Sequence, residues 1–445
     1  MKKPISLLLV LCMLLALAAC GGQERTAPDA PNPPTQTEGA ADSSAPDPAD
    51  APEPDPADSP APAPEEEPAP EKPEEPPVPA EYLILDPTVM PEGGQRDGVT
   101  YAAYDGVVEH LFFHPVIAYP ELAFDGDAQA NGLDDFMVTV NEFNKILDSL
   151  YEKDYILVDI GDVWSETAGE DGAPKMVRNT LYIPEGKTPM VFSYDDTNYY
   201  PYMLENGFAH KLVLGEDGKV WSWGLDPQGQ EVTSRDLDAI PILDKFVEEH
   251  PDFSPFGAKA CLSLTGYEGI LGYRTQTDGA VEWTEALEAN RQREREAVKP
   301  IIEELRRTGW TFGSHTWGHI RLGSGNMAKI QADTQKWFDE VGSLVGETDI
   351  LFYPHGERPD GGDWKQTGEA FKYLQGQGFR VFCSVGVESF SFIKKDICAV
   401  ICDRLHPDGK TLRWSRNRYL RFYDAKDIMD LDIRPDLGLG EDWNS

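Results

Sequence analysis

Apolar residues follow two different periods from residue 81 onwards. Short apolar runs predict buried strands, whereas longer stretches with apolar residues three or four apart predict amphipathic helices. The clearest helix is expected from Val138 to Lys153, and its apolar face consists of Val140, Phe143, Ile146, Leu147 and Leu150. Strands that alternate with helices in this way are typical of an α/β fold with a parallel sheet.

The same patterns locate the other elements. Strands are predicted at 110–117, 155–160, 190–194, 258–264, 349–353, 379–385 and 399–405. Further helices are predicted at 238–250, 284–307, 327–344 and 367–377. Residues 197–231 are rich in glycine and aromatic residues without a clear period, so we expect an irregular segment. Periodicity does not distinguish a closed sheet from an open one, but both kinds of α/β fold build their sites at the ends of strands.

The first twenty residues have the pattern of an export signal. Lys2 and Lys3 precede a short apolar run that ends in Leu17-Ala-Ala-Cys20, which is typical of a secretory signal peptide. A cysteine at the cleavage point resembles the lipobox of bacterial lipoproteins. We therefore expect a signal peptide at 1–20, a lipid on Cys20 and a place on the extracytoplasmic face of the cell membrane. An ordinary secreted protein is the alternative.

Residues 21–80 differ in composition from the rest of the chain. They hold 18 of its 36 prolines, and 15 acidic residues against two basic ones. Such a segment cannot bury a hydrophobic core, and its like charges repel one another. We predict a disordered linker at 21–80, followed by one folded domain at 81–445.

The charge of the whole chain narrows the classes of partner. Its 445 residues include 39 basic and 78 acidic side chains, which give a formal charge of −39. Nucleic acids bind positive surfaces, so this composition argues against a nucleic-acid partner. A neutral substrate, or one that becomes cationic, suits an acidic protein better.

Two of the eight histidines lie four residues apart, directly after a strand-like run at 310–313. On a helical turn, His315 and His319 would face the same way and could share one metal ion. Asp195 and Asp196 end an earlier predicted strand and offer a carboxylate as third ligand. Three protein ligands leave an open coordination position, as in catalytic zinc sites. Two unconnected surface histidines are the alternative.

Three segments in this order resemble the motifs of the polysaccharide deacetylases, the metal-dependent sugar N-deacetylases of carbohydrate esterase family four. The segments are Phe192-Ser-Tyr-Asp-Asp196, Ser314-His-Thr-Trp-Gly-His319 and Phe352-Tyr-Pro-His-Gly356. The resemblance covers most of 107–413. It implies a distorted, incomplete (β/α) barrel that removes N-acetyl groups from an aminosugar polymer such as peptidoglycan or a related cell-surface polysaccharide.

The resemblance also implies roles for single residues. The ligands of one divalent metal ion, expected to be Zn²⁺, would be Asp196, His315 and His319. Asp195 would be the general base, and the backbone N–H of His355 would stabilise the developing oxyanion. His406, after the last predicted strand, would be the general acid. A solvated turn histidine is the alternative, because Pro-Asp-Gly follows it at once.

The chain departs from the family pattern in two further places. Phe352 stands where the family has an arginine that orients the base, and Val385-Gly-Val-Glu-Ser389 stands where the family has an Asp-x-x-Asp-Trp segment. Two other functions are therefore compatible with the sequence. One is a polysaccharide-binding protein that keeps the metal site without turnover, and the other is a metal-dependent hydrolase of another amide or ester.

Other conspicuous side chains have more than one interpretation. The aromatic residues of the irregular segment could stack on sugar rings or form a small core of their own. They include Tyr199, Tyr200, Trp221 and Trp223. We interpret His114, on the first predicted strand, as a packed histidine rather than a ligand.

Overall fold

The structure is a computed structural model that describes residues 85–444 except 278, 280, 363–367 and 395–396. The predicted signal peptide at 1–20 and linker at 21–80 lie outside the described residues. Among the helices that are described, none has the length and hydrophobicity needed to span a membrane.

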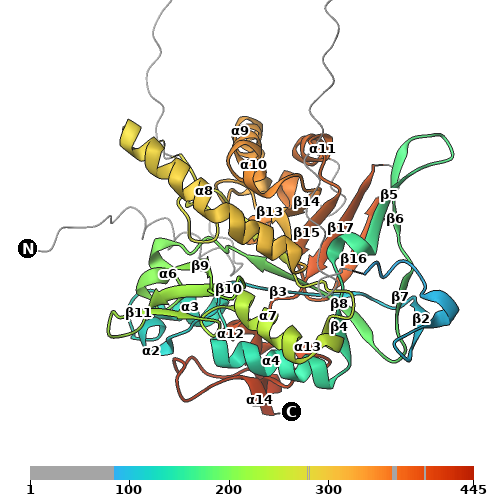
Figure 1. The fold of residues 1–445 in the computed structure, drawn as a ribbon, viewed down its shortest axis with the longest axis horizontal. Helices are drawn as coiled ribbons and strands as arrows, with labels where there is room; N and C mark the ends of the chain where they lie inside the picture. The colour runs from blue at the N-terminus through green and yellow to red at the C-terminus, as the bar shows by residue number, and fades with distance from the viewer. Residues whose placement is uncertain (1–84, 278, 280, 363–367, 395–396, 445) are drawn as a thin grey trace, which may run out of the picture. The chain divides into compact units, whose positions relative to one another are not determined.

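A mostly parallel sheet forms the centre of the fold, and helices pack around it (Figure 1). Its strand order is β16-β17-β15-β14-β13-β12-β8-β3, with β4 (Tyr155–Leu157) also paired to β8. All of these pairs are parallel except β16 (Phe390–Lys394) on β17. The other strands are β3 (Glu109–Phe113), β8 (Thr188–Asp195), β12 (Cys261–Leu264), β13 (Thr311–Ser314), β14 (Ile350–Phe352), β15 (Val381–Val385) and β17 (Ala399–Arg404).

The two ends of the parallel sheet meet. Leu405, directly after β17, forms a parallel bridge with Leu111 of β3. Phe112 donates its N–H to the Leu405 carbonyl, and Leu405 donates to the His110 carbonyl, both at 2.9 Å. This isolated bridge stands where a closed barrel would have a continuous ladder between β17 and β3. The barrel is therefore distorted and incompletely closed. The predicted incomplete (β/α) barrel is confirmed.

Helices cover the outward-facing side chains of the strands. The longer ones are α4 (Val140–Glu152), α7 (Ala239–Glu249), α8 (Glu285–Arg307), α9 (Met327–Trp337) and α11 (Glu369–Gly376). Short helices are α2 (Pro120–Ala123), α3 (Ala130–Phe136), α5 (Ile160–Val163), α10 (Ser343–Val345), α12 (Gly409–Trp414), α13 (Arg416–Tyr419) and α14 (Ala425–Ile428). The apolar face predicted for 138–153 is buried against strand residues such as Phe192 and Leu262.

Inside the barrel, apolar side chains give way to polar ones along each strand. Side chains of alternate residues point to the same face, and the interior cluster includes Val191, Phe352 and Cys402. Two and four residues beyond Val191 come Ser193 and Asp195, and two residues beyond Cys402 comes Arg404. The buried polar groups therefore gather at the C-terminal ends of the parallel strands, as expected for an α/β fold.

The prediction of an irregular segment at 197–231 is wrong. It contains α6 (Pro201–Glu205) and most of an antiparallel sheet of β9 (Lys211–Leu214), β10 (Val220–Leu225) and β11 (Glu231–Ser234). The residues of β10 alternate between buried and partly buried positions. The sequence does not show this alternation, because the large apolar Trp221 is on the more exposed face of the strand and Gly224, which has no side chain, is on the buried face.

Two further small sheets lie outside the barrel. One contains β1 (Gln95–Arg96), β2 (Val99–Tyr104) and β7 (Leu181–Pro184), and the other contains β5 (Trp164–Ala168) and β6 (Pro174–Arg178).

A buried ion-pair network attaches the C-terminal segment to α3 and α4. Arg434 donates to Glu142 at 2.7 and 2.5 Å and to Asp134 at 2.8 Å. Arg413 donates to both oxygens of Asp134, at 2.8 and 3.1 Å. These side chains are at most 2% exposed. Buried charges of this kind are tolerated only while each keeps its partners.

We expect Arg434→Ala to lower the free energy of unfolding by about 3–5 kcal/mol, because it leaves the buried Glu142 carboxylate without a guanidinium and takes one of two guanidinium partners from Asp134. Urea denaturation of the purified protein measures this loss. Lys245→Ala is the control, since its pair with Asp236 is 44% and 61% exposed and should contribute less than about 1 kcal/mol. Equal effects of the two substitutions would contradict the role given to the network.

Candidate metal centre

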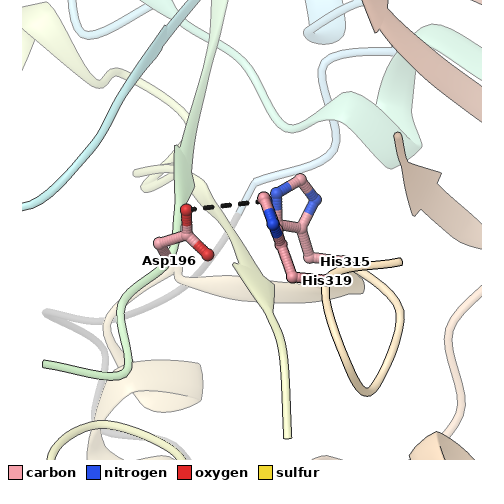
Figure 2. Close-up of side chains that lie close together, drawn as sticks. All are labelled: Asp196, His315 and His319. Atoms are coloured by element: carbon pink, nitrogen blue, oxygen red, sulfur yellow. Dashed lines mark ion pairs between the residues drawn. The ribbon is translucent and has the colours of Figure 1, made fainter. Parts of the chain in front are cut away.

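Asp196, His315 and His319 converge at the C-terminal ends of β8 and β13. Figure 2 shows both imidazoles facing the Asp196 carboxylate. One ligand atom from each residue lies within 4.8 Å of the other two, and Asp196 Oδ2 is 3.9 Å from His319 Nε2. Donor atoms that share one tetrahedral ion at ~2.1 Å lie roughly 3–4 Å apart. The donor set and its spacing therefore fit one divalent metal ion.

A hydrogen bond prepares His315 for this role. Its Nδ1 lies 3.0 Å from the backbone carbonyl of Phe352. A carbonyl only accepts, so Nδ1 carries the proton and Nε2 keeps its lone pair. Metal-binding histidines usually have such a partner on the second nitrogen.

The two histidines lie on a loop, so the prediction of a helical turn is wrong. Thr316 and His319 have positive φ angles of 59° and 48°, which a right-handed helix excludes. Asp333 of α9 holds the loop by accepting hydrogen bonds from the N–H groups of Trp317 at 2.7 Å and Gly318 at 2.8 Å. The imidazoles still come together, with ring centroids 4.9 Å apart.

Unfavourable backbone conformations are concentrated around this site. Nine non-glycine residues in the described ranges have positive φ, and they include Asp196 at 61°, His319 at 48° and His355 at 59°. Such a conformation costs of order 1–3 kcal/mol per residue and persists only where the surroundings enforce it. The orientation of these side chains therefore lowers the stability of the folded protein.

Asp195 has a different partner from its neighbour Asp196. Arg404, the last residue of β17, donates to its two carboxylate oxygens at 2.8 and 2.9 Å and to Ser193 Oγ at 3.1 Å. The guanidinium lies between the rings of Phe112 and Phe352, 4.1 and 4.6 Å from their centroids. The pair is buried, with side chains 0% and 4% exposed.

This pairing decides the protonation state of Asp195. Burial alone would raise the pKa of its carboxyl group, but the charge of Arg404 and the hydrogen bonds from its guanidinium outweigh burial. The pKa of Asp195 is held well below its ordinary value. Asp195 is therefore ionised throughout the neutral range, and its Oδ2 lies 3.9 Å from His315 Nε2.

Arg404 is a site residue that the sequence motifs did not predict. Phe352 does replace the arginine of the third motif, but its ring packs against a guanidinium that comes from another strand. A signal was present, because Arg404 stands two residues before the candidate His406 and so shares its face of the strand.

His406 belongs to a chain of hydrogen bonds that leads towards Asp196. Its Nδ1 lies 2.8 Å from Asp408 Oδ2, and its Nε2 lies 3.0 Å from His114 Nδ1. His114 Nε2 in turn is 3.9 Å from Asp196 Oδ2. As predicted, His114 is packed and is not among the described residues that could together hold a metal ion, but its hydrogen bond to His406 gives it a further place in the site.

The Pro-Asp-Gly turn after His406 has a definite part in this arrangement. Asp408 Oδ1 accepts from the N–H of Thr411 at 2.6 Å and caps α12, while Oδ2 faces His406. Burial would raise the pKa of Asp408, but His406 and the hydrogen bonds from Thr411 lower it. An ionised Asp408 only accepts, so Nδ1 of His406 carries a proton. His406 is thus 8% exposed and oriented, unlike a solvated turn histidine.

The remaining candidates divide between the site and the core. The exposed His355 lies beside the candidate ligands, with its ring centroid 4.4 Å from that of His319. Tyr199 is fully buried, and Trp221 and Trp223 belong to β10, so these three form part of local packing. Tyr200 is also buried, but its hydroxyl donates to Asp196 Oδ1 at 2.6 Å.

No protein-family model and no curated protein matches the sequence. Solved structures found to be similar include a Streptococcus pyogenes deacetylase in complex with acetate, with 11% identity and a TM-score of 0.35 over 70% of this chain and 95% of that one. Another is a polysaccharide deacetylase from Bacillus cereus, with 13% identity and a TM-score of 0.39 over 74% of this chain and 71% of that one. Because these values are low, conclusions about this chain rest on its own side chains.

We expect Asp196→Asn to weaken metal binding, because it replaces an anionic ligand by a neutral one. Titration of the metal-free protein with Zn²⁺ in the presence of a competing chelator measures the change. Asp154→Asn is the matched control, since Asp154 also has a positive φ, of 62°, but pairs with Lys187 away from the site. Unchanged affinity in Asp196→Asn would contradict the ligand assignment.

Proposed function

We propose that this protein is a metal-dependent deacetylase that removes N-acetyl groups from an aminosugar polymer, peptidoglycan or a related cell-surface polysaccharide. The observation that carries the proposal is the division of labour between two adjacent carboxylates. Asp196 faces two histidines that fit a metal ion, whereas Asp195 is held by Arg404 beside them. Metal-dependent hydrolysis of an amide combines a Lewis acid and a base at one place.

A bound divalent ion, for which Zn²⁺ is our first choice, would polarise the amide carbonyl and make water more acidic. Asp195 then acts as the general base. Because Arg404 lowers its pKa, Asp195 is a weak base and accepts a proton only from water that is already acidified. Turnover should therefore depend on the metal ion. The backbone N–H of His355, whose ring lies beside that of His319, is our candidate donor to the developing oxyanion.

The leaving amine needs a proton, and His406 is our candidate for the general acid. When His406 is doubly protonated, its Nε2–H donates to Nδ1 of His114. His114 then carries its own proton on Nε2, the nitrogen that faces Asp196. The chain from Asp408 through His406 to His114 can therefore pass a proton towards the site. Asp408 stabilises the doubly protonated imidazolium.

Acetate release from N-acetylglucosamine oligomers and from peptidoglycan, measured with and without a chelator, tests the proposal. We expect release that stops with the chelator and returns with Zn²⁺. Glycan binding by metal-loaded protein without acetate release would favour the binding-protein alternative. Hydrolysis of a chromogenic acetate ester, with no release from any glycan, would favour a hydrolase of another ester or amide.

Asp195→Asn should keep the metal ion but lose turnover by on the order of 10²–10⁴-fold, because the general base is removed. Acetate release per bound metal ion is the appropriate measurement. Asp196→Asn serves as the contrast, since it should lose activity through loss of metal. Turnover by Asp195→Asn near that of the unsubstituted protein would exclude Asp195 as the base.

His406→Phe should lower turnover by on the order of 10²–10⁴-fold while metal content stays unchanged. Phenylalanine can keep the stacking on Phe112, whose ring centroid is 4.2 Å away, but it cannot carry the proton. His250→Phe, on a histidine packed against Tyr151 at the end of α7, is the control. A silent His406→Phe substitution would show that the amine is protonated by another group.

We further propose that the protein acts at the cell envelope, held by a lipid on Cys20. The support is the charged, apolar and small-residue order of the first twenty residues. Bacteria that express the full chain should incorporate labelled fatty acid into it, and Cys20→Ser should abolish the label. Labelling that survives this substitution would refute the anchor without affecting the proposed chemistry.

A further inference from the structure

A tyrosine contacts the metal-binding carboxylate on its other oxygen. Tyr200 Oη lies 2.6 Å from Asp196 Oδ1 and 2.7 Å from Thr265 Oγ1. Asp196 Oδ2 is the oxygen that faces His319 and His114, at 3.9 Å from each. The two oxygens of one carboxylate thus have separate surroundings, a tyrosine on one side and imidazoles on the other.

The directions of these hydrogen bonds follow from the number of protons. A carboxylate that binds a metal ion is ionised and only accepts, so the single hydroxyl proton of Tyr200 goes to Asp196. Thr265 must then donate its own proton to Tyr200 Oη. The result is a directed chain from Thr265 through Tyr200 to Asp196, with no ambiguity about which atom donates.

The position of Tyr200 is fixed on several sides. It is 4% exposed, and its ring stacks between Tyr267 and Tyr202, with centroids 5.1 and 5.9 Å away. The side chain of Asn198 donates to the carbonyls of Thr265, at 2.9 Å, and Gly269. These contacts join the segment after β8 to the segment after β12, so the hydroxyl cannot easily follow a moving carboxylate.

We propose that Tyr200 is a positioning residue that makes Asp196 a one-oxygen ligand. Its hydrogen bond occupies Oδ1 and presents Oδ2 to the metal ion, which keeps a coordination position open for substrate. This role of Tyr200 depends on the metal centre of the proposed function. The aromatic composition of 197–231 suggested sugar stacking or a small core, but not the positioning of a metal ligand. Loss of such a supporting hydrogen bond typically weakens metal binding by about 10- to 100-fold.

The test compares metal binding by full-length, metal-free protein and its Tyr200→Phe variant. Zn²⁺ titration against a competing chelator should show an affinity about 10- to 100-fold lower in the variant. With Co²⁺ as spectroscopic probe, the freed Oδ1 should add a ligand and weaken the visible absorption, because four-coordinate Co²⁺ absorbs more strongly than five-coordinate Co²⁺. A role in packing alone would not change this spectrum.

Two further variants complete the experiment. Thr265→Val should shift affinity in the same direction by less, whereas Tyr202→Phe, which removes a hydroxyl from the adjacent ring of the stack, should change neither affinity nor spectrum. Unchanged Zn²⁺ affinity and Co²⁺ spectrum in Tyr200→Phe would overturn this inference and leave the metal centre standing. Absence of metal binding by the unsubstituted protein would overturn both.

Discussion

The buried ion pair between Arg404 and Asp195 is the interaction on which the rest of the site depends. The two residues end β17 and β8, which flank β3 at the place where the barrel closes. Their charges are tolerated in the interior because two hydrogen bonds join the carboxylate and the guanidinium directly. The guanidinium also donates to Ser193 and contacts two aromatic rings. Loss of either partner would leave an uncompensated charge in the core.

This ion pair also separates the tasks of two neighbouring aspartates. Successive side chains at the end of a strand can point in different directions. The positive φ of Asp196 turns its side chain further away from that of Asp195. Asp195 remains in the strand and faces Arg404. Asp196 turns towards His319 and Tyr200. Two carboxylates that are neighbours in the sequence therefore have separate partners, Arg404 for Asp195 and the Tyr200 hydroxyl for Asp196.

Loops rather than regular elements present most of the polar groups, and buried side chains hold those loops in place. Asp333 binds two N–H groups of the histidine loop, Asp408 both caps α12 and orients His406, and Asn198 joins the segments after β8 and β12. Such supports are needed because the backbone at Asp196, His319 and His355 is unfavourable by itself. The rigidity of the site is thus distributed over residues that never contact a metal ion.

The sequence by itself determined the parts of this protein that local patterns encode. The apolar period of 138–153 predicted α4, and the apolar runs predicted the parallel strands of the barrel to within a few residues but not the antiparallel β16. Asp195, Asp196, His315 and His319 were recognisable because a strand end or a short spacing brings them together. Where glycine and tryptophan broke the alternation, as in β10, the prediction was wrong.

The tertiary structure decided which distant residues complete the site. Arg404 meets Asp195 from 209 positions away, His406 meets His114 across 292, and Tyr200 meets Thr265 across 65. These contacts depend on strand register and on the closure of the barrel, which no local pattern specifies. Local patterns also failed to predict the backbone of the histidine loop, although its two histidines are close in the sequence. Its two imidazoles were expected to converge on a helical turn, and a loop held by Asp333 brings them together instead.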